Sequence, residues 1–276
     1  MAMFALSQAG AIPAKACKQP SLILVVILIF RTIIVKRKTT MKKTLLILCA
    51  ALTIGGRTAL AQEKMDARTV ETGHLSGVEA RSGFDVILKQ GASSGAVISV
   101  DSRLEPYLQV EIEDGILRIG FDNIPIGLQR RNLARKAEIT VNALERLDVH
   151  SGSRVVGNGS FTAPACDIDV HSGASVSGID IDAKTVSVDV RSGAKAVVSG
   201  FADRLEASTS SGATANLRDL QARNVQADAS SGSSLRCCAT RSIRGRASSG
   251  ASVRYAGGAT QVNTGSSSGG SYGPMK

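Results

Sequence analysis

The chain carries seven Ser–Gly pairs at a nearly constant spacing between Leu147 and about Gly270. Successive serines are separated by 21, 20, 19, 20, 18 and 19 residues. A repeat of this length is too short to bury a hydrophobic core alone, so its copies have to stack on one another. The seven pairs are Ser151–Gly152, Ser172–Gly173, Ser192–Gly193, Ser211–Gly212, Ser231–Gly232, Ser249–Gly250 and Ser268–Gly269.

The residues before each serine alternate between apolar and polar types, as in Leu147-Asp148-Val149. Alternation at period two predicts a half-buried strand, and no repeat leaves room for the longer apolar pattern of a helix. We therefore predict an all-β fold, a single-chain β-solenoid whose repeats each supply two or three short strands. Its coils would stack about 4.8 Å apart. An antiparallel β-sandwich remains the alternative, because it also has short, regularly spaced strands.

Residues 68–142 alternate in the same way but lack the Ser–Gly spacing. Asp114–Gly115 joins two alternating runs and is typical of a two-residue hairpin turn. We expect this N-terminal β region to cap the first coil, residues 143–264 to form the coils, and residues 265–276 to form a flexible tail. The predicted strands are Phe84–Leu88, Ala96–Val100, Leu108–Ile112, Ile116–Ile119 and Ile139–Val141.

The basic charge of the chain is concentrated at its N-terminus. Residues 1–61 hold nine of the 33 Lys and Arg residues and none of the 23 acidic ones, which leaves 24 basic and 23 acidic residues in the remainder. The net charge therefore gives no reason to expect a nucleic-acid partner. One basic cluster lies in the polar loop Asp122–Lys136, where it is either solvated or faces an anionic polymer. Its members are Arg130, Arg131, Arg135 and Lys136.

Residues 41–61 have the three parts of a secretory signal peptide. Met41-Lys42-Lys43 is the charged start, Thr44–Ile54 is the apolar run, and Ala59-Leu60-Ala61 is a small-residue cleavage site before Gln62. Residues 1–40 then form an upstream extension; the alternative is a membrane anchor over residues 22–35. We expect an exported protein of the periplasm or outer cell surface, without a stable transmembrane segment in the mature chain.

Two outward columns form the candidate site. Asp148, Asp169 and Asp189 recur three residues before their serines, and His150 and His171 recur directly before theirs. Stacked carboxylates repel one another, so something should neutralise them. The neighbouring basic side chains are one answer. A divalent cation, either Ca²⁺ on the aspartates or Zn²⁺ with the histidines added, is the other.

No other residue set in the sequence predicts catalysis or a cofactor. The repeated serine recurs where no histidine is near, so we interpret it as a turn residue and not as a nucleophile. The mature chain has three cysteines, which we expect to be buried, with a Cys166 bond to Cys237 or Cys238 as the lesser alternative. Adjacent Cys237 and Cys238 should point to opposite faces of a strand.

Over residues 68–256 the chain resembles the head-GIN-domain family, described as autotransporter adhesins of bacterial envelopes. The resemblance lies in Ser82-Gly-Phe-Asp-Val-Ile-Leu-Lys-Gln-Gly91, in Leu117-Arg-Ile-Gly120, and in the run from Ile139 to Gly152 that leads into the Ser–Gly repeats. It implies an exported, β-helical, non-enzymatic protein and supplies no catalytic residues. We therefore expect an adhesin-like binding or structural module with an envelope or surface ligand, glycan or protein. The alternatives are a polysaccharide-active β-helix enzyme and a self-assembling envelope scaffold.

Overall fold

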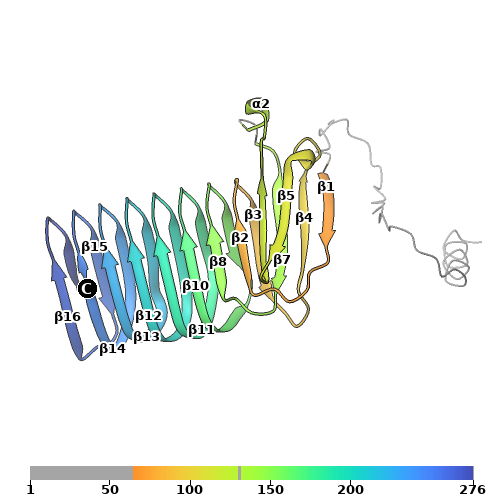
Figure 1. The fold of residues 1–276 in the computed structure, drawn as a ribbon. Helices are drawn as coiled ribbons and strands as arrows, with labels where there is room; N and C mark the ends of the chain where they lie inside the picture. Colours follow the sequence, from red (N-terminus) through yellow and green to blue (C-terminus); the bar gives the residue numbers. More distant parts are fainter. Residues whose placement is uncertain (1–64, 130–131, 276) are drawn as a thin grey trace, which may run out of the picture. The chain divides into compact units, whose positions relative to one another are not determined.

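The computed structural model describes residues 65–129 and 132–275 as a β-solenoid (Figure 1). The predictions for residues 1–61, Arg130 and Arg131 lie outside this part of the chain. No helix within it has the length and apolarity needed to cross a membrane. The strands are β1 (Met65–Val70), β2 (Gly77–Ala80), β3 (Asp85–Gln90), β4 (Gly95–Asp101), β5 (Leu108–Glu113), β6 (Ile116–Phe121), β7 (Arg135–Val141), β8 (Arg146–Val149), β9 (Arg154–Gly157), β10 (Ser160–Val170), β11 (Ser175–Val190), β12 (Lys195–Thr209), β13 (Thr214–Ala229), β14 (Ser234–Ala247), β15 (Ser252–Ala256), β16 (Gln261–Ser266) and β17 (Ser271–Pro274); the short helices are η1 (Glu105–Tyr107) and α2 (Ile126–Gln129).

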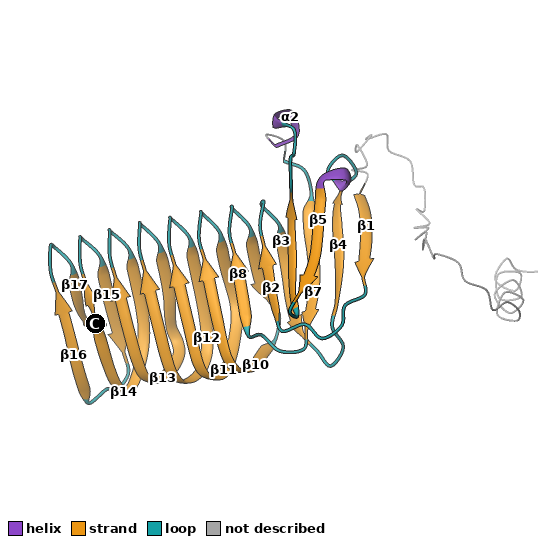
Figure 2. Cartoon of the chain, viewed as in Figure 1, coloured by secondary structure: helices purple, strands orange, loops and turns teal. Residues whose placement is uncertain are grey.

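Strand β11 shows how one coil is built. Its first residues, Ser175–Ser177, pair in parallel with β9, whereas Asp180–Val190 pair in parallel with β10. The strand thus runs along one layer of the solenoid, bends in its middle and returns along the other layer. Figure 2 shows the Ser–Gly loops along one edge and continuous strand along the other. We call these the turn edge and the bend edge. The parallel pairing confirms the predicted solenoid and excludes the antiparallel sandwich.

Both residues of a Ser–Gly pair adopt positive φ. The φ angle is 54° at Ser172 and 72° at Gly173, and the Ala174 N–H donates to the His171 carbonyl at 3.2 Å. This combination is a type I′ turn, whose twist matches that of the strands it joins. The Gly173 N–H also donates to the Ser192 carbonyl of the next coil at 3.1 Å, which holds neighbouring turns in register.

The core between the two layers is narrow and apolar. Val149, Val170 and Val190 stand in register on successive coils, and each is completely buried. In the six turns from Ser151 to Ser249, the position after the glycine is buried as well and carries a small side chain, which suits the tight turn edge. These residues are Ser153, Ala174, Ala194, Ala213, Ser233 and Ala251.

The two serines at that buried position have hydrogen-bond partners. Ser153 Oγ accepts from the Phe84 N–H at 3.2 Å, and Ser233 Oγ lies 2.9 Å from Thr209 Oγ1. Neither hydroxyl therefore carries the penalty of an unpaired buried polar group.

The coils begin before the repeats that the sequence marks. Strands β2 and β3 pair in parallel with β8 and β9, and Ser82–Gly83 between them has the same turn, with φ angles of 64° and 75°. Strands β6 and β7 add a further parallel layer, on which β5 and the β4–β1 pair lie antiparallel and end the stacking. The predicted hairpin turn at Asp114–Gly115 is confirmed, with φ angles of 51° and 76°. All five strands predicted in this region are present; β1 and β2 were not predicted.

The sequence suggested a flexible tail from Gly265, whereas the structure places residues 265–275 in a further coil. Ser268–Gly269 forms another turn of the same type, and β16 and β17 pair with β14 and β15. Tyr272 occupies the inward position next to Val253, and its ring lies 6.1 Å from that of Tyr255. Here the Ser/Gly-rich composition reflects turn geometry.

Candidate functional site

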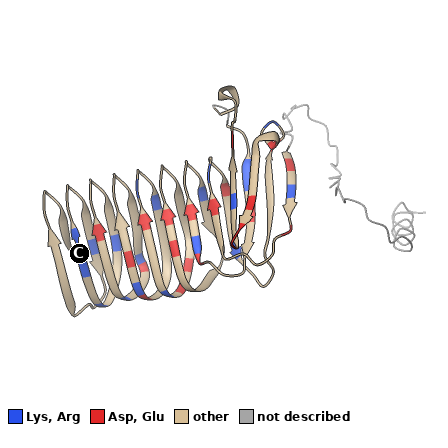
Figure 3. Ribbon diagram, viewed as in Figure 1, with Lys and Arg blue, Asp and Glu red and all other residues tan. Residues whose placement is uncertain are grey.

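Four carboxylates stand in register near the turn edge, one on each of four neighbouring coils. They belong to Glu79, Asp148, Asp169 and Asp189, on β2, β8, β10 and β11 (Figure 3). We call this set the acid ladder. The sequence predicted the three aspartates but missed Glu79, although Glu79 precedes Ser82 by the same three residues. An alignment begun at Ser82–Gly83 would have found it.

The two candidate histidines lie beside the first half of the acid ladder, where Glu79 also pairs with Arg118 at 3.1 Å. His150 Nε2 lies 3.7 Å from Glu79 Oε1, and His171 Nε2 lies 3.9 Å from Asp148 Oδ1. Each histidine thus reaches back to the carboxylate of the preceding coil. The two imidazole rings stack with centroids 4.8 Å apart and an interplanar angle of 2°. This spacing is the coil repeat itself, so the side chains follow the backbone ladder.

Arg191 likewise reaches back to the carboxylate of the preceding coil, which is Asp169. Its guanidinium lies 2.6 Å from Asp169 Oδ2 and 3.7 Å from Asp189 Oδ2. Burial raises the pKa of Asp169, and the carboxylates of Asp148 and Asp189 raise it further, while Arg191 and His171 lower it. One oxygen each of Asp148 and Asp169 is buried without a hydrogen bond. Arg191 is therefore the permanent cation that pairs with the second half of the acid ladder.

The metal hypothesis gains no geometric support. In residues 65–129 and 132–275, no group of three or more His, Cys, Asp or Glu side chains is arranged to hold a metal ion. The five candidates lie in one ladder, but their charged ends pair between coils and do not converge on a point.

A serine, a histidine and a carboxylate come together at two turns. Ser172 Oγ lies 3.0 Å from His171 Nδ1, whose other nitrogen faces Asp148, and Ser151 and His150 repeat the contact at 3.0 Å. Acyl transfer also needs N–H donors for an oxyanion. The glycine N–H groups beside these serines already donate to the carbonyls of the next turns. We therefore interpret both serines as turn residues.

All three described cysteines are free thiols, and Cys166 lies far from the adjacent Cys237 and Cys238. Cys166 is buried in β10 and Cys237 in β14, with three strands between them. Four coil steps separate them by about 19 Å along the ladder, beyond the reach of a disulfide. Cys238 is partly exposed, so the adjacent pair points to opposite faces as predicted.

Part of the basic loop has a structural role. Arg135 Nη1 donates to the Ser82 carbonyl at 2.8 Å, and its guanidinium lies 5.6 Å from the centre of the Phe121 ring. Partial burial lowers the pKa of this arginine. Arg135 thus packs against the first coil and is not presented to a polymer.

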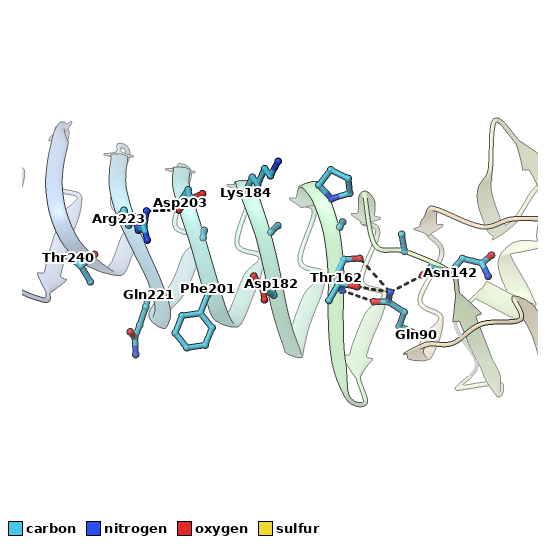
Figure 4. A pocket seen from close by; sticks show the side chains of 15 residues that line it. Gln90, Asn142, Thr162, Asp182, Lys184, Phe201, Asp203, Gln221, Arg223 and Thr240 are labelled. Atoms are coloured by element: carbon cyan, nitrogen blue, oxygen red, sulfur yellow. Dashed lines mark hydrogen bonds and ion pairs between the residues drawn. The ribbon is translucent and has the colours of Figure 1, made fainter.

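A groove runs along the bend edge and crosses several coils, with a volume of about 780 Å³ (Figure 4). We call it the edge groove. Ala163, Ala183 and Ala202 contribute its floor. One flanking row consists of Thr162, Asp182, Phe201 and Gln221, which are in register on β10 to β13, and the other of Lys184, Asp203 and Arg223.

The side chains of the edge groove differ in how firmly they are held. At one end Gln90 donates to Thr162 Oγ1 at 3.0 Å and accepts from the Thr162 N–H at 2.6 Å. Further along, Arg223 and Asp203 pair at 3.4 Å while both remain largely exposed. Phe201 is 59% exposed. Sequence reasoning missed this residue, although aligned repeats place it in an otherwise polar column.

A family model matches residues 74–259, and it is described as "Putative auto-transporter adhesin, head GIN domain". No curated protein sequence matches the chain.

Solved structures share the fold at low sequence identity. A putative adhesin from Bacteroides fragilis matches with a TM-score of 0.70 and 17% identity, covering 78% of this chain and 98% of its own. A putative lipid binding protein from Parabacteroides distasonis matches with a TM-score of 0.60, 16% identity and the same coverages. A putative adhesin from the latter organism gives a TM-score of 0.59 and 14% identity, again covering 78% and 98%.

Proposed function

Because the chain belongs to the head-GIN-domain family, we propose that it is an exported, non-enzymatic, adhesin-like binding module of the bacterial cell envelope. The observation that carries the proposal is the edge groove. Each carboxylate of the acid ladder lies beside a histidine or an arginine, whereas the groove presents an exposed aromatic ring next to two polar side chains that are unpaired within the described chain, Asp182 and Gln221. Such a combination of apolar and polar groups in a hollow is typical of a ligand site.

Export rests on the leader. The arrangement of Met41-Lys42-Lys43, an apolar run and Ala59-Leu60-Ala61 supports secretion with cleavage before Gln62. N-terminal sequencing of the protein isolated from bacterial cells tests it. Gln62 at the N-terminus is the expected result, and a retained Met1 or Met41 would contradict it.

The edge groove offers the enzymatic alternative one unpaired acid and one acid that is held in an ion pair. Glycoside hydrolysis uses two carboxyl groups beside the bond that is cleaved. Asp182 and Asp203 line the edge groove, but Asp203 is paired with Arg223, which leaves Asp182 as the unpaired carboxylate in this groove. Turnover of neutral or uronate glycans by the purified protein would favour the enzyme.

Attachment of cells tests the binding role. Bacteria that lack the chain should attach to a glycan- or protein-coated surface less than bacteria that carry it, and restoring the chain should restore attachment. Equal attachment of the two strains would contradict the proposal. Concentration-dependent fibres of the purified protein would instead favour the scaffold alternative.

A further inference from the structure

We infer that the edge groove binds an uncharged glycan chain lying along the solenoid axis, with one sugar ring stacked on Phe201. The inference rests on the proposed binding function and names the ligand class of the same groove. It follows from the exposure of Phe201, from the free polar groups beside it, and from the balance of charge around it.

Phe201 points outward from its strand. It stands in register between two polar residues, Asp182 on one side and Gln221 on the other. Its ring is 59% exposed, although the adjacent Ala202 is buried in the core. An exposed phenyl ring gains little in the free protein, but it offers a flat apolar face to a ligand. The C–H face of a sugar ring is a surface that stacks on such a ring.

The neighbours of Phe201 supply the polar half of a sugar site. Asp182 and Gln221 are exposed, and neither has a hydrogen-bond or ion-pair partner among the described residues. The carboxylate accepts hydrogen bonds, and the amide both donates and accepts them. Figure 4 shows both side chains on the same side of the ribbon as the Phe201 ring. Hydroxyl groups at the rim of a stacked sugar ring are the partners that fit this set.

The charges of the edge groove favour an uncharged ligand. Two acidic residues, Asp182 and Asp203, and two basic residues, Lys184 and Arg223, line it. The groove thus has no net charge to attract a polyanion or a polycation. The polar groups on both rows are also a poor match for an acyl chain, since burying them without partners would cost free energy.

The solenoid repeat accounts for an elongated ligand. Successive coils present one residue of each row about every 4.8 Å along the axis. A polysaccharide extended along the groove would therefore meet one residue of each row at every coil. The contact between Gln90 and Thr162 occupies one end, so the open stretch runs from Asp182 past Phe201 to Gln221.

Native gel electrophoresis of the purified full-length protein through neutral polysaccharides tests the inference. Separate gels contain xylan, mixed-linkage β-glucan, mannan or glycogen, and further gels contain polygalacturonate or heparin. We expect at least one neutral polysaccharide to retard the protein. Phe201→Ala should weaken that apparent affinity about tenfold, as expected for the loss of a stacking contact. Phe201→Tyr should keep it.

Val197→Ala is the matched control, because Val197 is an exposed apolar residue of the same strand that lies outside the groove. Equal melting temperatures for the variants would show that the fold is intact. Three outcomes overturn the inference: no retardation by neutral polysaccharides, retardation that Phe201→Ala leaves unchanged, or retardation by the polyanions alone. If cells still attach through the chain in any of these cases, the proposed function stands and the groove assignment fails.

Discussion

Gly200→Ala should destabilise the solenoid much more than Gly193→Ala. Gly200 has a φ of 119° and stands in register with Ile181 on the preceding coil. A Cβ at this position would lie 2.7 Å from the Ile181 nitrogen and 2.8 Å from its carbonyl carbon, and closer still to its oxygen. Backbone atoms of a paired strand cannot turn aside as a flexible side chain would, so the two coils would have to separate.

Gly193 isolates the conformational part of the cost. It belongs to a turn with a φ of 71°, and a Cβ there meets nothing within 4 Å. Its replacement should cost about 1 to 2 kcal/mol, the penalty of a left-handed conformation. Gly200→Ala adds overpacking to that strain and should cost about 4 kcal/mol.

Thermal unfolding followed by circular dichroism measures the difference. For a domain of this size, the melting temperature should fall by roughly 2 to 8 °C in Gly193→Ala and by roughly 8 to 16 °C in Gly200→Ala. Equal losses in the two variants would refute the close approach of the coils, and with it the argument that this glycine permits their stacking.

Three further predictions concern the hydrophobic core, unfolding at low pH and the buried thiols. Val188→Asp should abolish the folded β spectrum, because Val188 is 1% exposed and an aspartate there would be an unpaired charge in the core. Hydrogen bonds from Arg103 lower the pKa of Asp101 to about 2, so this group stabilises the fold above about pH 4 and loses that effect as the pH falls towards 2. Asp101→Asn should therefore lower the free energy of unfolding by about 1 to 2 kcal/mol at pH 7 and make it depend less on pH between about 2 and 4. An unchanged pH dependence would contradict this role of Asp101. Burial raises the pKa of Cys166 and of Cys237 to about 12, so a thiol reagent at pH 8 should label neither until denaturant is added, and labelling of the native protein would argue against a closed core.

The repeat made the solenoid predictable, because its period and its alternation both follow from the backbone. The inward residue two positions before each turn serine and the small residue after most turn glycines could be identified from the repeat spacing alone. Glu79 and Ser82–Gly83 follow the same spacing as the later repeats, but the long insertion between β3 and β8 hid this relation. The number of coils was therefore harder to predict than the structure of a single coil.

The candidate site was only partly predictable. Equivalent positions of successive repeats could be aligned from the sequence, so the aspartates of the acid ladder and their basic neighbours were predicted together. The way in which His150, His171 and Arg191 reach back to the carboxylate of the preceding coil depends on side-chain positions that a sequence does not give. The edge groove was missed although its floor left a signal in the repeats: an alanine recurs nine residues before the turn serine at Ala163, Ala183, Ala202 and Ala222. Phe201 could have been noticed, because it is an apolar residue between the polar residues Asp182 and Gln221 in the aligned repeats.

The most direct test of the central claim is the equilibrium binding of the full-length chain to an array of glycans and cell surfaces, with and without Ca²⁺. We expect saturable binding to a neutral glycan that Phe201→Ala weakens and that Ca²⁺ leaves unchanged, since the carboxylates of the acid ladder do not converge on a metal site in the described part of the chain. A well-folded protein that binds nothing on the array, or that binds only when Ca²⁺ is present, would contradict it.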